Sequence, residues 1–434
     1  MIIRQIDLRG KVLGKSELKN LIPRGNFSVA DALIKIQPTL DKVKTGSEDD
    51  LKKLCLEFDG IAPKSIRVDK DELVKALSEL DPKIKAALEV AITQVRKVAK
   101  DQLPQAVTTE VIPGGVVDRK WVAVDRVGLY VPGGVASYPS SVIMNVLPAL
   151  IAGVKSIAVA SPPQKENGGL PNKIILATCQ LLGVTELYAI GGAQAVAMFA
   201  YGVKGVCESV DMVTGPGNIY VAAAKRALRG VIGIDSEAGP TEIAILADNS
   251  AIPSDVAADL ISQAEHDVMA AAVLVTNSSE LVTKLLPELE KRVAATKHSK
   301  RISQSLSGEQ SAIILVDSID QGVEVINAYA PEHLELLLTD AKERSRQIRN
   351  AGAIFLDRYS PVSLGDYAAG SNHVLPTGGC ACHSSGLSVN TFMRNISVIH
   401  YNQSAFNKVA QDVITLADAE DLPAHGDAIK SRFE

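Results

Sequence analysis

Residues 128–160 read GLYVPGGVASYPSSVIMNVLPALIAGVKSIAVA, and this stretch decides the fold class. It begins with a short apolar run, passes through a loop rich in proline and glycine into an apolar helical pattern, and ends in a second apolar run. A strand, a helix and another strand in this order form a βαβ unit, whose two strands lie parallel in one sheet. The stretch therefore predicts an α/β domain built on a parallel sheet.

The alternation of apolar runs and helical patterns continues downstream in two series. The first series extends to about residue 229, and the second begins at residue 242. Because helical segments separate the strands, both series predict parallel sheets with helices on their faces. We expect strands at 128–131, 156–160, 186–190, 211–214, 242–247, 271–276, 311–316, 334–339 and 352–357, and first-series helices near 141–153, 172–182, 193–201 and 218–229.

The segments outside the two series have a different character. Ser47 and Asp50 resemble a helix capping box, and Asp81-Pro82 is a favourable start for another amphipathic helix. The β-like segments VTTEVI and RKWVAV flank Pro113-Gly114-Gly115, as in a hairpin. At the other end, one strand (SVIHY) precedes one or two helices that would pack on another domain or subunit. The sequence thus predicts an α/β fold of two doubly wound, Rossmann-like parallel-sheet domains with a helical N-terminal region and a small C-terminal segment.

Composition excludes several classes of function. The 434 residues are 46% hydrophobic and carry a formal net charge of -5 without a block of five like charges, which argues against a nucleic-acid or polybasic membrane surface. The longest apolar stretch, Val142 to Val154, contains Pro148 and is too short to span a bilayer. Charged residues in MIIRQIDLRG interrupt any secretion signal, and five scattered cysteines are typical of a reducing compartment. We therefore expect a soluble, cytoplasmic protein.

Three predicted junctions between a strand and a helix are rich in glycine: 131–134, 190–194 and 215–218. Glycine lets a backbone approach a ligand closely, and a helix N-terminus attracts phosphate. None of the three matches the dinucleotide fingerprint G-x-G-x-x-G, since Tyr220 stands where its third glycine belongs. Each loop alone could be a simple tight turn, whereas three at one sheet edge favour a nucleotide.

Two polar pairs are candidates for chemistry. Gln263 and His266 fall on the apolar side of a predicted helix that Ser254 would cap, so either a metal ion or a structural hydrogen bond must satisfy them. Glu332 and His333 stand immediately before an apolar strand, where they suit proton transfer. The alternative for this second pair is an exposed pair of charges at a strand entrance.

Further carboxylates and imidazoles follow in the last seventy residues. Asp366 and His373 lie in a segment rich in small and polar residues and are suited to metal and substrate contact. Glu420 and His425 offer another such pair near the end of the chain. By contrast, the run from Cys380 to His383 lacks a second ligand pair at zinc-finger spacing, so we do not expect it to bind zinc.

Taken together, these segments are similar to the histidinol dehydrogenase family over nearly the whole chain. The similarity is carried by an ordered series of motifs: GLYVPGG, SYPSSVIMN, GGAQAVA, VTGPGNIYV, EAGPTEIAILAD, DLISQAEHD, APEHLEL, GDYAAGSNHVLPT and AHGDA. The resemblance implies an NAD-dependent enzyme with one zinc ion per subunit that oxidises L-histidinol to L-histidine through L-histidinaldehyde, in the last step of histidine biosynthesis. It also implies a homodimer with shared active sites.

The resemblance also assigns roles to individual residues. The implied catalytic residues are His333, as general base, and Glu332, which activates water. The implied zinc ligands are Gln263, His266, Asp366 and His425. NAD contacts are implied at Tyr130, Gln194 and Asn218, and substrate contacts at Thr241, Gln263, His266, His333, Asp366, His373, Glu420 and His425.

The family pattern also suggests how the chain divides. We expect an N-terminal segment (1–25) that packs with the C-terminal part, a helical region and hairpin (26–127) in the substrate and metal domain, an NAD-binding domain (128–236), a second Rossmann-like domain with the catalytic residues (237–388), and a C-terminal segment (389–434) that reaches the partner subunit.

Two features depart from the family pattern or leave room for another reading. Thr241 stands where many relatives carry serine, and Val362 where some carry glutamate.

No cysteine lies within the quoted motifs, so we expect no thiol in catalysis. The alternatives are a zinc-dependent amidohydrolase or deaminase, which would leave the glycine loops unused, and a non-catalytic metabolite-binding protein, which would be expected to have lost candidate residues.

Overall fold

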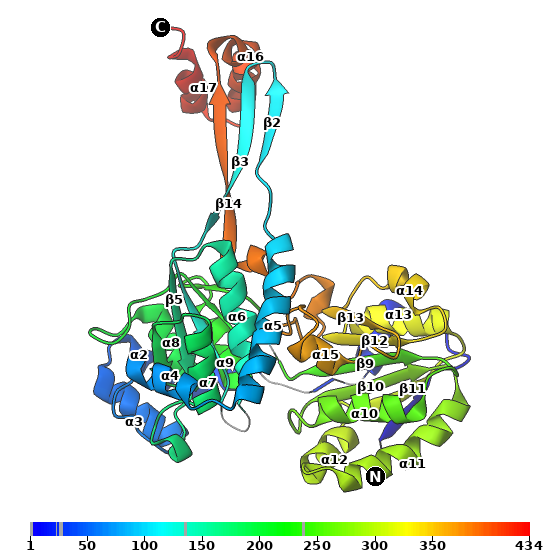
Figure 1. Cartoon of the computed structure of the whole chain (residues 1–434). Helices are drawn as coiled ribbons and strands as arrows, with labels where there is room; N and C mark the ends of the chain where they lie inside the picture. Colours follow the sequence, from blue (N-terminus) through cyan, green and yellow to red (C-terminus); the bar gives the residue numbers. More distant parts are fainter. Residues whose placement is uncertain (1–2, 23, 26–28, 134–136, 237–238) are drawn as a thin grey trace.

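Two lobes and a projecting arm make up the molecule (Figure 1). The structure is a computed structural model that describes residues 3–22, 24–25, 29–133, 137–236 and 239–434. Each lobe is built on a parallel sheet, and the arm is a three-stranded antiparallel sheet. No helix within the described ranges is both long and apolar enough to cross a membrane.

The first lobe contains a five-stranded parallel sheet in the order β6-β5-β4-β7-β8. The chain runs outward from β4 through β5 to β6, then returns to the other side of β4 for β7 and β8. This is the Rossmann strand order, in which the reversal beside the first strand opens a crevice for a ligand. The strands are β4 (Arg126–Tyr130), β5 (Ser156–Ser161), β6 (Leu187–Ala189), β7 (Met212–Thr214) and β8 (Gly233–Ile234).

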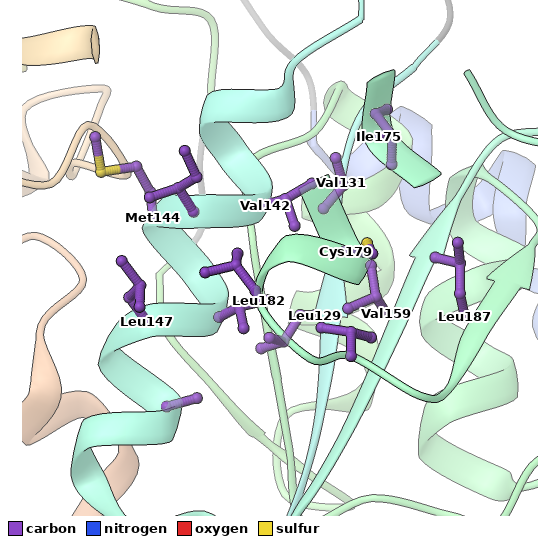
Figure 2. Packing of buried hydrophobic residues seen from close by; sticks show 14 of the residues in the cluster. Leu129, Val131, Val142, Met144, Leu147, Val159, Ile175, Cys179, Leu182 and Leu187 are labelled. Atoms are coloured by element: carbon purple, nitrogen blue, oxygen red, sulfur yellow. The ribbon is translucent and has the colours of Figure 1, made fainter. Parts of the chain in front are cut away.

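Helices cover both faces of this sheet because successive strand residues point to opposite faces. Leu129 and Val159 pack with α6 and α7 on one face, as Figure 2 shows, whereas Tyr130 and Ala158 face α8 and α9. These strand residues are buried, and the sheet is therefore apolar on both sides. The helices are α6 (Pro139–Ala152), α7 (Lys173–Leu181), α8 (Gly192–Tyr201) and α9 (Ile219–Leu228).

Four N-terminal helices add a second layer to the first lobe. They are α2 (Val29–Lys44), α3 (Glu48–Phe58), α4 (Lys70–Ser78) and α5 (Pro82–Asp101). Helix α2 packs against α8 and α9, α4 against α7, and α5 against α6. The expected assignment of 26–127 to the substrate and metal domain is therefore wrong for these helices, since their apolar faces complete the core of the first lobe. The capping residues Ser47 and Asp81 do stand at helix starts as predicted.

The second lobe contains a six-stranded parallel sheet in the order β1-β11-β10-β9-β12-β13. Its strands β9 (Glu242–Ala247) and β10 (Ala271–Thr276) have the predicted bounds, and every residue in both strands is buried. The remaining strands are β1 (Arg4–Asp7), β11 (Ala312–Leu315), β12 (His333–Leu337) and β13 (Ala353–Leu356). Strand β1 pairs with β11, so the described N-terminal residues join this lobe.

Two groups of helices sandwich the second sheet. One apolar cluster joins the sheet to α10 (Pro253–Ala264), α11 (Ser279–Ala295) and α12 (Ser299–Ser307). The cluster on the opposite face involves α1 (Lys15–Leu21), α13 (Ile319–Tyr329) and α14 (Ala341–Arg344). Helix α15 (Val362–Tyr367) follows β13. Beyond it the chain returns to the core of the first lobe, where Val374 and Phe392 are buried, so the expected boundary at residue 388 does not separate two cores.

The arm is formed by segments from two distant parts of the chain. Strands β2 (Val107–Ile112) and β3 (Gly115–Ala123) form the predicted hairpin, and β14 (Met393–Tyr401) pairs antiparallel with β3. Helices α16 (Gln403–Ala419) and α17 (Pro423–Lys430) lie at the tip of the arm, away from both lobes (Figure 1).

Candidate active site

Glu332 and His333 lie at the amino end of β12, between β9 and β13 in the interior of the second sheet. Their side chains are only 8% and 5% exposed. Ala330, with a left-handed φ of 49°, ends α13 just before the chain turns into this strand. The pair is therefore fixed inside a buried strand entrance, which excludes the alternative of exposed charges.

Backbone and side-chain groups around β9 hold this pair in place. Oε2 of Glu332 accepts hydrogen bonds from the Thr241 hydroxyl (2.7 Å) and the Glu242 amide (2.8 Å). Nδ1 of His333 lies 3.1 Å from the carbonyl oxygen of Glu242 and 3.5 Å from Oε2 of Glu332. Since both neighbours of Nδ1 are acceptors, Nδ1 carries a proton, and Nε2 of a neutral imidazole is the basic atom.

Electrostatics favour a positive charge on His333. Burial opposes the charge, but the carboxylates of Glu332 and Asp366 outweigh burial and raise the pKa of His333 to about 9. Nε2 lies 3.9 Å from Oδ1 of Asp366 and is buried without a hydrogen bond to any described residue. A cation bound to the Asp366 carboxylate would oppose this rise in the pKa of His333. It would thereby favour the neutral imidazole, whose Nε2 is basic.

Gln263 extends the hydrogen-bonded chain from helix α10. Its side chain is buried, and its amide nitrogen donates to the Thr241 hydroxyl, which in turn donates to Glu332. His266 is placed differently from the prediction, because α10 ends at Ala264 and His266 is exposed in the turn that follows. The predicted cap at Ser254 is also wrong, since Pro253 already occupies the first turn and Ile252 is the N-cap.

His373 connects the second lobe to the first. Its Nδ1 lies 3.1 Å from the carbonyl oxygen of Asp366, and its Nε2 lies 3.1 Å from the hydroxyl of Ser141 at the start of α6. Burial lowers the pKa of His373, which favours its neutral form. Ser141 belongs to the quoted motif SYPSSVIMN, but no sequence pattern signalled that it would meet His373.

Glu420 and His425 are not part of this cluster within one chain. Glu420 caps the end of α16 and His425 lies in α17, so both are at the tip of the arm (Figure 1). Both side chains are exposed. Over the part of the chain that the structure describes, no group of three or more His, Cys, Asp and Glu residues is arranged to hold a metal ion.

The candidate nucleotide residues gather at the carboxyl edge of the first sheet. Tyr130 is the last residue of β4, and its hydroxyl accepts a hydrogen bond from the Gly192 amide (3.2 Å). Gln194 is buried in the first turn of α8, and its amide nitrogen has no hydrogen-bond partner among the described residues. Asn218 caps α9 by accepting from the amides of Tyr220 and Val221. Of the predicted glycine loops, Gly134 lies outside the described residues.

The two lobes meet between this edge and the amino end of β9. A cavity of about 280 Å³ is lined by Ile219 and Ala222 of α9 and, from the other lobe, by Glu242. Arg24 also lines this cavity and forms an ion pair with Glu242 (2.6 Å). Cys380 lines the cavity too; it begins the short 3-10 helix Cys380–Cys382, whose two thiols form no disulfide. Thus the carboxyl edge of the first sheet adjoins the amino edge of the second.

This arrangement defines a class of enzyme: a two-lobed α/β protein whose Rossmann-type sheet edge adjoins a buried pair of acid/base residues. The family model for histidinol dehydrogenase matches residues 22–433. The histidinol dehydrogenases of Thermobifida fusca (strain YX) and Streptomyces avermitilis are 59% and 58% identical to this chain, each over 100% of it and 98% of the relative. The chain belongs to the histidinol dehydrogenase family.

A solved structure agrees with this membership. The crystal structure of histidinol dehydrogenase from Elizabethkingia anophelis superimposes with a TM-score of 0.92 at 32% sequence identity, covering 100% of this chain and 99% of that one. The predicted α/β class with two parallel-sheet domains is thereby confirmed. The chain is an oxidoreductase of a family that takes part in histidine biosynthesis.

Proposed function

We propose that this chain oxidises L-histidinol to L-histidine through L-histidinaldehyde, using two molecules of NAD, in the last step of histidine biosynthesis. The family of the chain supports the substrate and the overall reaction. The observation that carries the proposal is the buried pair of Glu332 and His333, held by one strand beside the carboxyl edge of a Rossmann-type sheet. Each oxidation removes one hydride and one proton, and water supplies the second oxygen of the carboxylate.

His333 acts as the general base for the alcohol. Its Nδ1 is engaged by the Glu242 carbonyl, so Nε2 takes the hydroxyl proton as the hydride leaves the carbinol carbon. Glu332 acts on the aldehyde: one carboxylate oxygen is fixed by Thr241 and Glu242, and the other takes a proton from the water that adds to the carbonyl carbon. The resulting hydrate loses the second hydride. NAD, when bound, supplies the acceptor for each hydride.

Residues at the carboxyl edge of the first sheet would hold NAD. Tyr130 ends β4, whereas Gln194 follows β6 and Asn218 follows β7. All three lie at that edge, where Rossmann-type sheets bind nucleotides. The buried, unpartnered amide nitrogen of Gln194 fits a hydrogen-bond acceptor on a ligand. The dipole of α9 places partial positive charge at its first turn, which suits a phosphate.

The donor chemistry of the site fits a zinc ion. The amide nitrogen of Gln263 is committed to Thr241, which leaves its oxygen for a cation, and Asp366 adds a carboxylate beside His333. We assign a further ligand to His266, whose imidazole is exposed in the turn after α10. We assign the fourth ligand to His425 of the partner subunit. Zinc, when bound, orients the substrate and stabilises negative charge that develops on its oxygen. Thr241, His373 and the partner's Glu420 would contact the substrate directly, together with the zinc ligands and His333.

A homodimer with shared active sites accounts for the arm. Its tip carries Glu420 and His425 away from the lobes of the same chain, so a partner subunit is needed to bring them to a site. Apolar side chains on the arm are exposed, including Val398, Ile399 and Leu416. Contact with a second copy would bury them. Cysteines that form no disulfide fit a reducing compartment, and we propose the cytoplasm.

The decisive experiment measures how many molecules of NADH form for each molecule of L-histidinol. Purified protein is incubated with zinc, excess NAD and limiting L-histidinol, and NADH absorbance is followed to completion. We expect two NADH for each L-histidinol, because both oxidations occur on one substrate. One NADH would contradict the second oxidation, and no NADH from zinc-loaded protein would favour a hydrolase on the same fold.

A further inference from the structure

The first sheet lacks an acidic residue where Rossmann folds commonly carry one. In those folds an Asp or Glu beyond the second strand of the unit binds the adenosine ribose. Strand β5 is the corresponding strand, since it follows β4 and lies beside it. It ends at Ser161 and continues into Pro162-Pro163, so the chain has no carboxylate there.

Asp59 comes to this place from a different part of the chain. A Cβ atom added at Gly191 would contact the ring of Pro162 and lie 3.3 Å from Oδ1 of Asp59. One turn before Asp59, the thiol of Cys55 lies 3.8 Å from the carbonyl oxygen of Ala189 at the end of β6. The end of α3 therefore lies over the carboxyl ends of β5 and β6, beside Gly191.

Within the described ranges, no residue donates a hydrogen bond to the Asp59 carboxylate or neutralises its charge. Oδ2 is buried without a hydrogen bond, and no ion pair joins Asp59 to another residue of the described chain. Burial raises the pKa of Asp59 to about 6. Asp59 is also the C-cap of α3, where the helix dipole disfavours a negative charge. A purely structural role does not explain an acid at this position.

The position of Asp59 along the sheet matches one end of a dinucleotide. Helix α9, which follows β7, lines the interlobe cavity together with Glu242. The Glu242 carbonyl contacts His333, so the β7 side of the first sheet is the side nearer to His333. Strand β6 is the edge strand on the opposite side. A dinucleotide whose nicotinamide reaches His333 would therefore extend its adenosine half toward β5 and β6.

We infer that the Asp59 carboxylate accepts hydrogen bonds from the ribose hydroxyls of the adenosine half and thereby selects NAD over NADP. This inference rests on the proposed use of NAD and assigns the residue that sets cofactor preference. A 2′-phosphate would place further negative charge against a carboxylate that no cation neutralises. Gly191 complements Asp59, because a side chain there would meet Pro162 and the carboxylate.

The test measures binding of a ligand that lacks nicotinamide. ADP-ribose and its 2′-phosphate are titrated by calorimetry into the full-length wild type, Asp59→Asn and Glu57→Gln, the last a matched control because Glu57 is an exposed acid on the same helix. We expect Asp59→Asn to weaken ADP-ribose binding about tenfold, the value of one charge-assisted hydrogen bond. The preference for ADP-ribose over its 2′-phosphate should narrow, and Glu57→Gln should bind as the wild type does. Asp59 caps α3 through its backbone amide, which donates to the Cys55 carbonyl, so Asp59→Asn retains this cap.

The outcomes separate this inference from the proposed reaction. Equal affinity of the wild type and Asp59→Asn for ADP-ribose, or an equal loss in both variants, would overturn the ribose assignment even if L-histidinol yields two NADH. A loss of ADP-ribose affinity in Asp59→Asn but not in Glu57→Gln would support the ribose assignment, even if the wild type failed to oxidise L-histidinol. That failure would overturn only the proposed reaction.

Discussion

Lys225 and Asp235 form a buried ion pair that holds both backbone polar groups of one residue, Gly215. Nζ of Lys225 donates to the Gly215 carbonyl (3.0 Å), and the Gly215 amide donates to Asp235 (2.9 Å). Gly215 has a φ of 120°, and a Cβ there would lie 2.0 Å from the carbonyl oxygen of Tyr130. The pair therefore fixes the loop that leads into α9.

Replacing Lys225 with methionine should lower the free energy of unfolding and disturb the loop that leads into α9. Loss of one partner leaves Asp235 buried and uncompensated, which costs about 3–5 kcal/mol of unfolding free energy. We also expect a raised KM for NAD. Urea denaturation and steady-state kinetics measure the two effects, with the exposed Lys204→Met as control. Unchanged stability of Lys225→Met would show that the ion pair does not hold the loop.

His333→Gln should lower turnover severely without loss of metal. The variant removes the group assigned as general base, a role typically worth 10²- to 10⁴-fold in rate. His333 is not among the proposed zinc ligands, so the zinc content should match that of the wild type. Turnover and metal analysis on the same preparation give both values, with the exposed His383→Gln as control. Near-normal turnover would contradict the assignment.

Two inactive variants should complement each other if active sites are shared. Glu332→Gln impairs the site in the lobes of its own chain, whereas His425→Asn impairs the site of the partner subunit. A mixed dimer has one site free of both changes, so we expect about half of the wild-type activity per heterodimer. Differently tagged chains allow heterodimers to be purified and assayed. Verified heterodimers without activity would count against sharing.

Glu335→Gln should stabilise the protein at alkaline pH. Burial, and next the carboxyl group of Asp259, raise the pKa of Glu335 above its ordinary value of 4.5. The folded protein then holds a proton that the unfolded chain has released, so this site makes the free energy of unfolding fall as pH rises above about 4.5. The glutamine variant should gain more at pH 8 than at pH 5.5 in urea denaturation. The exposed Glu343→Gln serves as control, and an equal effect at both pH values would exclude the raised pKa.

The sequence predicted the buried parallel strands well because a strand buried on both faces is an apolar run with clear ends. Strands β9 and β10 have their predicted bounds for this reason. The sequence pattern missed β1, which is mostly exposed, and β8, which has only two residues. The sequence of an amphipathic helix such as α2 or α5 shows which face is buried but not which element covers that face. The packing of these helices on the first lobe was therefore not predicted. The early end of α10 was also missed, since no glycine or proline follows Gln263 to mark it.

The candidate residues were found by motif, whereas their arrangement depends on contacts between distant segments. The rule that ligands bind at the carboxyl ends of strands suits the first sheet, but Glu332 and His333 lie at the amino end of β12 in the second. No local pattern signals that Ser141 meets His373, or that Asp59 lies beside Gly191. Such pairs arise from tertiary packing alone.

The composition of the arm also bears on the order in which the protein is made. Strand β14 begins at Met393, so the ribosome completes both parallel sheets before the hairpin of β2 and β3 acquires its third strand. Until then β3 presents an unpaired edge, which invites pairing with other chains. The second lobe can fold as it emerges, whereas the core of the first lobe also needs Val374 and Phe392, which come shortly before β14. The arm is therefore completed only after the strands of both parallel sheets have been made.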